Sequence, residues 1–162
     1  DSNSTAIHAD GTLGRGVSEI ALERQENEGS SRIEASHDGY ARRFGLIHKR
    51  TLLLSGDGRE LRGDDVLLPS KAKQKPMTSA FAIRFHLAPG IEATPTADGM
   101  GALLRIERGA LWQFRCRGGT LSIEESLWID GEARPHNTVQ LVVSGEASPG
   151  GASVGWALRR AG

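Results

Sequence analysis

The 162-residue chain carries 20 Lys and Arg against 20 Asp and Glu, so its formal net charge at neutral pH is zero. This balance argues against a protein that holds nucleic acid through a net positive field. No apolar stretch approaches the roughly 20 residues that a membrane-spanning helix needs, and glycine is abundant at 21 residues. Length and composition therefore predict one domain, residues 1–162, of a β protein with many turns, without a membrane span or a nucleic-acid partner.

Alternation of apolar and polar residues is the dominant pattern along the chain. In residues 17–24 a strand competes with a short helix, and the strand is favoured. Further on, Tyr40, Phe44 and Leu46 are predicted to line one side of a strand that continues to Leu54. The same alternation recurs in residues 81–87, 112–117, 139–143 and 154–158.

Turn signals separate these segments at regular intervals. Glycine recurs in them because tight hairpin turns require positive φ values. About ten short strands with such turns indicate an antiparallel β-sandwich or a barrel, and the broad apolar faces favour an all-β sandwich of about ten or more strands. The basic segment 70–78 is predicted to be a solvated connection. The turn signals lie at residues 38–39, 56–58, 89–90, 98–99, 118–119, 130–131 and 149–151.

No standard catalytic motif is present. The chain has no phosphate-binding loop, no Gly-x-Ser-x-Gly elbow, no HExxH and no paired CxxC. The single cysteine, Cys116, lies in an alternating segment and is interpreted as a small buried hydrophobic residue. We therefore assign no catalytic residue and no metal ligand within this chain. Its function must depend on surface recognition or on residues outside it.

One run between residues 36 and 50 concentrates side chains that could bind an anionic sugar. Tyrosine and histidine can act as general acids or bases, and arginine binds carboxylate or sulfate through two parallel hydrogen bonds. The ordinary alternative is a turn whose tyrosine is half-buried and whose cations face water. His37 and His48 could approach each other across a hairpin, but two histidines without a placed carboxylate are a weak metal signal. The full run comprises His37, Asp38, Tyr40, Arg42, Arg43, His48, Lys49 and Arg50.

A second basic set lies on the polar faces of predicted strands. Arg84, His86, Arg115 and Arg117 could form one basic sheet face for an acidic ligand or a neighbouring domain, or an ordinary solvated face. Trp128, flanked by carboxylates, either stacks on a sugar ring or covers the edge of the sandwich. The candidate substrate-binding residues from both sets are His37, Tyr40, Arg42, Arg43, His48, Arg84 and Arg115.

Five segments, in this order, resemble the C-terminal part of the heparinase II/III-like family of bacterial proteins. The resemblance covers nearly the whole chain and is more specific for the family than for a substrate. The segments are residues 36–50 (SHDGYARRFGLIHKR), 52–65 (LLLSGDGRELRGDD), 81–90 (FAIRFHLAPG), 118–126 (GGTLSIEES) and 156–160 (WALRR).

The resemblance implies polysaccharide lyase chemistry on uronic-acid-containing glycans. In this family an N-terminal helical toroid packs against β-sandwich domains, and removal of the uronate C5 proton leads to β-elimination. The toroid and a histidine-containing motif, in some members with a divalent metal, are expected to lie outside this chain. The chain would then be an inactive C-terminal fragment that needs no cofactor of its own, supports the toroid and lines the cleft for an acidic polysaccharide. The alternative is a non-enzymatic carbohydrate-binding or structural docking domain, and the compartment stays open between periplasm and cytoplasm.

Overall fold

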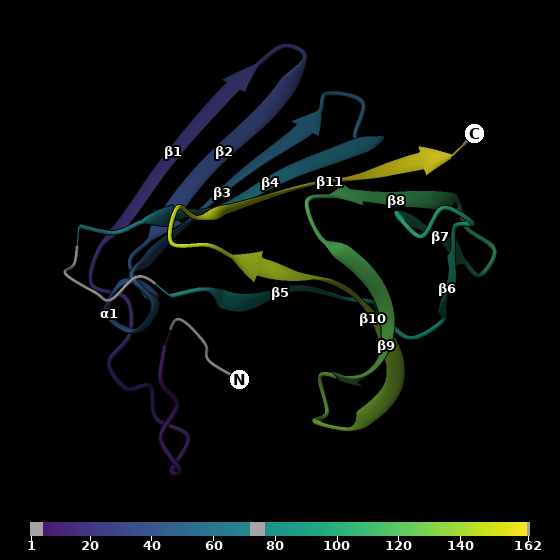
Figure 1. Cartoon of the computed structure of the whole chain (residues 1–162). Coiled ribbons are helices and arrows are strands. Elements are labelled where there is room, and N and C mark those ends of the chain that lie inside the picture. Colours follow the sequence, from purple (N-terminus) through teal and green to yellow (C-terminus); the bar gives the residue numbers. More distant parts are fainter. Residues whose placement is uncertain (1–4, 72–76, 162) are drawn as a thin grey trace.

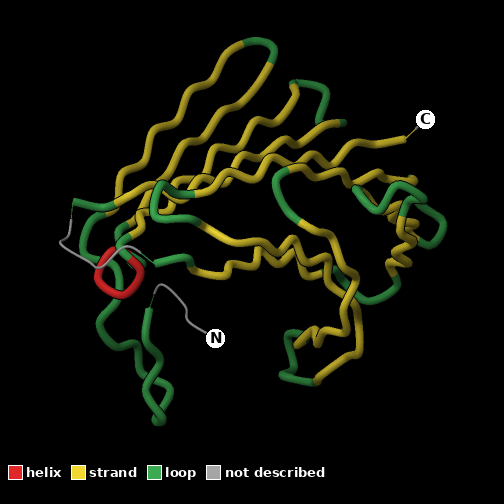
Figure 2. The backbone as a smooth tube through the Cα atoms, in the orientation of Figure 1, coloured by secondary structure: helices red, strands yellow, loops and turns green. Residues whose placement is uncertain are grey.

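The computed structural model describes residues 5–71 and 77–161, and it confirms the predicted antiparallel β-sandwich. Eleven strands form two sheets in this part of the chain, with one short helix (Figures 1 and 2). The elements are β1 (Ile20–Asn27), β2 (Ser30–His37), α1 (Ala41–Phe44), β3 (Leu46–Ser55), β4 (Glu60–Pro69), β5 (Ser79–His86), β6 (Ile91–Pro95), β7 (Gly101–Ile106), β8 (Leu111–Arg117), β9 (Thr120–Ile129), β10 (Pro135–Ala147) and β11 (Ala152–Ala161).

The two sheets differ greatly in width. The large sheet has the strand order β1-β2-β3-β4-β11-β8-β7-β6, and the small sheet has the order β5-β10-β9. The core cluster draws its buried side chains mainly from β7, β8 and β11 of the large sheet and from β10 of the small sheet. In contrast, every residue of β1 is exposed. The small sheet therefore covers only part of the large one, and β1 to β3 extend beyond it (Figure 1).

Aromatic side chains fill the centre of the covered part. The rings of Phe85 and Trp156 meet edge to face with centroids 4.9 Å apart, and Phe85 also lies 5.0 Å from Phe114. Gly63 lies opposite Trp156 in the sheet, and a Cβ atom there would approach the indole to 2.2 Å. Cys116 is buried in the same cluster, as predicted, and burial raises the pKa of its thiol. The thiol therefore serves as a core group, since a thiolate is disfavoured there.

The prediction of one strand from Tyr40 to Leu54 is wrong at its start. Residues 41–44 form the single turn α1, and β3 begins only at Leu46. Gly45 ends the turn with φ 69°, a left-handed conformation that glycine adopts readily. β2 and β3 are antiparallel neighbours, so the chain must reverse here, and the helical turn makes that reversal.

The remaining local predictions have mixed outcomes. The strand favoured over a helix for residues 17–24 is confirmed from Ile20 onward, where β1 begins. Of the basic segment 70–78, residues 72–76 lie outside the described part of the chain. Nowhere in residues 5–71 and 77–161 is a helix long and apolar enough to cross a membrane.

Candidate functional site: a cleft between the two sheets

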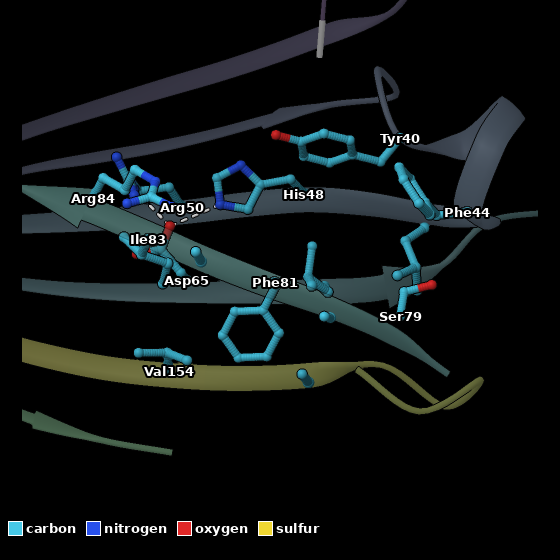
Figure 3. Close-up of a pocket in the computed structure, with 15 residues that line it drawn as sticks. Tyr40, Phe44, His48, Arg50, Asp65, Ser79, Phe81, Ile83, Arg84 and Val154 are labelled. Carbon is cyan, nitrogen blue, oxygen red and sulfur yellow. Dashed lines mark hydrogen bonds and ion pairs between the residues drawn. The ribbon is translucent and has the colours of Figure 1, made fainter. Parts of the chain in front are cut away.

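A cleft of about 530 Å³ lies where the large sheet extends beyond the small one. Its floor is the inner face of β3, β4 and β11, and β5, an edge strand of the small sheet, forms the opposite wall (Figure 3). Tyr40 and Phe44 border one end of the cleft from the turn before β3. The polar groups on its floor are His48, Arg50 and Asp65.

Strand register brings these polar groups together. Arg50 of β3 lies directly opposite Asp65 of β4, and Asp65 in turn lies opposite Val154 of β11. Val154 and Trp156, two residues further along β11, both belong to the core cluster, so this face of the sheet points toward the small sheet. Asp65 consequently sits on the inner face, at the boundary between the apolar core and the open cleft.

Asp65 is the centre of the polar network. Only 5% of this residue is exposed, yet it accepts hydrogen bonds from Arg50 Nε at 2.6 Å, His48 Nε2 at 2.7 Å and Trp156 Nε1 at 2.9 Å. Burial by itself raises the pKa of this carboxyl group, but the hydrogen bonds from His48, Arg50 and Trp156 outweigh that effect and the pKa lies below its ordinary value. Asp65 is therefore an ionised carboxylate that holds three side chains in place.

The two histidines form a chain of hydrogen bonds that ends at Asp65. The distance from His37 Nε2 to His48 Nδ1 is 3.2 Å, and the Gly39 backbone N–H donates to His37 Nδ1 at 3.2 Å. Since Nδ1 of His37 accepts that bond, its proton resides on Nε2, and His48 must accept at Nδ1 while it donates from Nε2 to Asp65. Burial and the neighbouring His48 both lower the pKa of His37. The hydrogen bonds thus define a tautomer for each ring, and burial favours the uncharged form of His37.

Tyr40 presents a phenol beside this chain. Its ring centroid lies 5.3 Å from that of His37 and 6.4 Å from that of His48. Phe44 meets the other side of the ring edge to face at 6.2 Å. Within the described residues the Tyr40 hydroxyl makes no hydrogen bond, and Ser79 Oγ, on the β5 wall, is buried without a partner. The cleft thus offers the Tyr40 phenol and the Arg50 guanidinium group, which suit a ligand rich in hydroxyls and carboxylates.

Three of the predicted binding residues come together here. His37, Tyr40 and His48 are neighbours, and the expected approach of the two histidines is confirmed. Arg84 lies on the β5 wall, but its guanidinium group donates to Glu124 of β9 at 3.1 Å. Its charge is therefore directed across the small sheet, and Arg50 is the cation at the cleft floor.

The other predicted residues lie elsewhere. Arg42 and Arg43 belong to α1, where the Arg43 guanidinium stacks 5.3 Å above the Phe44 ring. Arg115 is on the outer face of the large sheet and donates to Asp98. The idea of one basic sheet face is wrong, because Arg84 and His86 belong to the small sheet whereas Arg115 and Arg117 belong to the large one. Alternation along single strands could not reveal which sheet each strand joins.

Sequence reasoning missed Asp65 and Trp156. A signal for Asp65 was available in the turn at residues 56–58, because a hairpin centred there places Arg50 opposite Asp65. No comparable local signal exists for Trp156, which is 91 residues from Asp65 and reaches it only because β11 inserts beside β4. Within the described ranges, 5–71 and 77–161, no group of three His, Cys, Asp or Glu side chains is arranged to hold a metal ion.

The family model described as "Heparinase II/III-like, C-terminal" matches residues 1–157. The chain belongs to this family. Among solved structures, it is similar to the heparan sulfate lyase HepC from Pedobacter heparinus, with a TM-score of 0.73 and 10% identity over 87% of this chain and 21% of that one. It is also similar to a heparinase III, with a TM-score of 0.72 and 11% identity over 88% and 22% of the two chains. At such low identity these likenesses show a shared fold.

One relative by sequence is named for its location and not for a lyase activity. FtsZ-localized protein C from Caulobacter vibrioides is 32% identical over a match that covers 99% of this chain and 31% of the relative. This heparinase II/III-like chain thus spans about a third of that protein and about a fifth of the two lyases. The chain is therefore similar in fold to two proteins named as lyases, and similar in sequence to one named for its location.

Proposed function

We propose that this chain is the β-sandwich portion of a longer heparinase II/III-like protein, and that its inner cleft binds an acidic polysaccharide. The observation that carries the proposal is the convergence of Tyr40, His48 and Arg50 on one cleft at the uncovered part of the sheet. The family and the fold shared with two lyases support the substrate class.

The chemistry of the cleft fits a uronate ligand. The Arg50 guanidinium uses its Nε to bind Asp65, and it has further N–H groups that can bind a ligand carboxylate. Neutralising a uronate carboxylate lowers the barrier to removal of the C5 proton, which is the first step of β-elimination. We assign the proton-abstracting group to a portion of the longer protein outside this sequence, where a helical toroid would pack against the sandwich. The role of this chain is then to support that portion and to hold the glycan.

Exposed apolar residues support a partner at this end of the sandwich. Ile20 and Leu22 of β1 are 75% and 71% exposed, and Leu54 of β3 is 42% exposed. The strand register places all three on the same face as Arg50 and Trp156. Large apolar side chains exposed beside a polar cleft are typical of an interface with another domain.

The test measures binding of uronic-acid oligosaccharides to the 162-residue chain by calorimetry. Arg50→Gln should weaken binding about tenfold or more, because it removes a charge-assisted contact, and Tyr40→Phe should weaken it about fivefold, because it removes one hydrogen bond. Arg105→Gln, which removes a charge from an exposed position of β7, is the matched control and should bind normally. Unchanged affinity in both cleft variants would contradict the proposal.

Activity is tested on the longer protein. Addition of the uronic-acid polymer should release unsaturated uronate, which absorbs in the ultraviolet, and Arg50→Gln should reduce its rate of formation. The 162-residue chain alone should release none. Cleavage by this chain alone would show that the missing chemistry is wrongly assigned to another portion.

A second candidate function is a non-enzymatic docking domain. The observation that favours it is the 32% identity to FtsZ-localized protein C, which is named for an association with FtsZ and not for a reaction. The test is co-sedimentation of this chain with FtsZ polymers. Sedimentation that is unaffected by Tyr40→Phe and Arg50→Gln would favour docking, and a chain that stays in the supernatant would argue against it.

A further inference from the structure

An open depression of about 420 Å³ lies over β4, β11 and β8 and includes the outer surface of the large sheet. Trp156 of β11 points into the core, so its neighbours Gly155 and Ala157 face outward. Gly155 is buried because the Arg117 guanidinium lies directly over it, where a Cβ atom would approach Arg117 Nε to 2.4 Å. The partly exposed methyl group of Ala157 forms the open floor beside it. The depression is distinct from the inner cleft, whose polar row lies on the other face of the same sheet.

Arginines stand on both sides of this floor. Ala157 lies between Arg62 of β4 and Arg115 of β8, and Gly155 lies beside Arg117 of β8. Because adjacent strands are about 4.8 Å apart, the backbones that carry Arg62 and Arg115 are about 10 Å apart, with the methyl group of Ala157 between them. We call this feature the arginine trough, and it consists of Arg62, Arg115, Arg117 and Arg159 around Gly155 and Ala157.

The trough has more cations than carboxylates. Arg62 and Arg159 share the single carboxylate of Glu60, and Arg117 contacts Asp64 at 3.3 Å. Arg115 is paired with Asp98 at 2.7 Å, so four guanidinium groups face three carboxylates. Exposed ion pairs of this kind are weak, and these contacts use only one or two of the five N–H groups of each arginine.

Glu60 organises one end of the trough. Hydrogen bonds from Arg62 and then Arg159 lower the pKa of Glu60 to about 2. Glu60 is therefore ionised across the physiological range and keeps the two guanidinium groups side by side. A site that is organised before binding loses less side-chain entropy when a ligand arrives.

We propose that the arginine trough is a second glycan-binding site, which takes the sulfate or carboxylate groups of an acidic polysaccharide on the face opposite the inner cleft. The choice of a glycan as the ligand rests on the function proposed above. The location of the site is argued separately, from the geometry of the arginine trough. Guanidinium groups bind both oxyanions through paired hydrogen bonds.

The experiment measures the affinity of a size-defined heparan sulfate oligosaccharide for the 162-residue chain. Arg117→Gln and Arg159→Gln should each weaken binding about tenfold, through loss of a charge-assisted contact. Ala157→Val keeps every charge, but its larger side chain fills the floor, and it should weaken binding to a similar degree. Arg24→Gln, on exposed β1, removes one positive charge outside the trough and should leave affinity unchanged.

Each outcome decides between the two sites. Loss of binding in the trough variants, with normal binding in Tyr40→Phe, supports the trough and contradicts the function proposed for the cleft. Loss only in the cleft variants overturns the trough and leaves the cleft proposal standing. If the arginine variants bind weakly but Ala157→Val binds normally, the attraction is unspecific and the trough is overturned. Equal or tighter binding of a DNA duplex of matched charge would overturn the glycan as its occupant.

Discussion

The covered and uncovered parts of the large sheet share one antiparallel hydrogen-bond pattern but differ in the side chains on their inner face. Under the small sheet, the inward positions of β8 and β11 carry Phe114 and Val154, each 2% exposed. Beyond it, equivalent inward positions of β3 carry His48 and Arg50. Asp65 lies at the boundary and accepts hydrogen bonds from Arg50 and His48 in the cleft and from the core indole of Trp156. Inner-face positions under the small sheet are apolar and buried, whereas beyond it they carry both polar groups and exposed apolar residues such as Leu22 and Leu54.

The largest expected effect is in the covered part. Phe114→Ala should lower the free energy of unfolding by about 4 kcal/mol, because it leaves a cavity beside Phe85 and Trp156. Leu54→Ala, at a 42% exposed position of the uncovered part, should cost less than about 1 kcal/mol. Urea denaturation followed by tryptophan fluorescence measures both. Equal losses would mean that the two parts of the sheet are buried alike.

Removal of the boundary carboxylate should have the next largest effect. Asp65→Ala leaves Arg50, His48 and Trp156 without their common acceptor, so the free energy of unfolding should fall by about 3 kcal/mol. Asp64→Ala is the matched control, since it changes the adjacent residue on the outer face and should cost under about 1 kcal/mol. The same urea titration measures both variants. An unchanged free energy of unfolding in Asp65→Ala would contradict the central role of this carboxylate.

A smaller effect concerns pH. The pKa of His37 is lowered below 6.5 in the folded state by burial and by His48, so the unfolded state binds a proton more readily than the folded state. The stabilisation from neutral His37 is present above pH 6.5 and is lost as the pH falls through the folded-state pKa. His37→Gln should flatten this decline in a series of denaturation curves between pH 7 and about pH 5. If the stability of His37→Gln declined with the same slope, the pH dependence would arise from other titratable groups.

The smallest effect on stability is expected at the edge of the uncovered part. Leu22→Ser on β1 should change the free energy of unfolding of this chain by no more than about 0.5 kcal/mol, because the leucine is 71% exposed. In the longer protein the same change should weaken packing of the neighbouring portion, which limited proteolysis would detect. Glu23→Ser, on the outer face of the same strand, is the control and should alter neither measurement.

Alternation and turns by themselves determined that this chain is an antiparallel sandwich, because period-two burial is a property of each strand taken alone. They also indicated that His37 and His48 could meet, since the two flank one reversal of the chain. Tertiary structure alone decided that β11 lies between β4 and β8, which brings Trp156 to Asp65. It also decided that β5 joins the small sheet, which separates Arg84 from Arg115. The physical reason is that the partner of a strand depends on side chains distant in sequence, whereas its alternation depends only on its own residues.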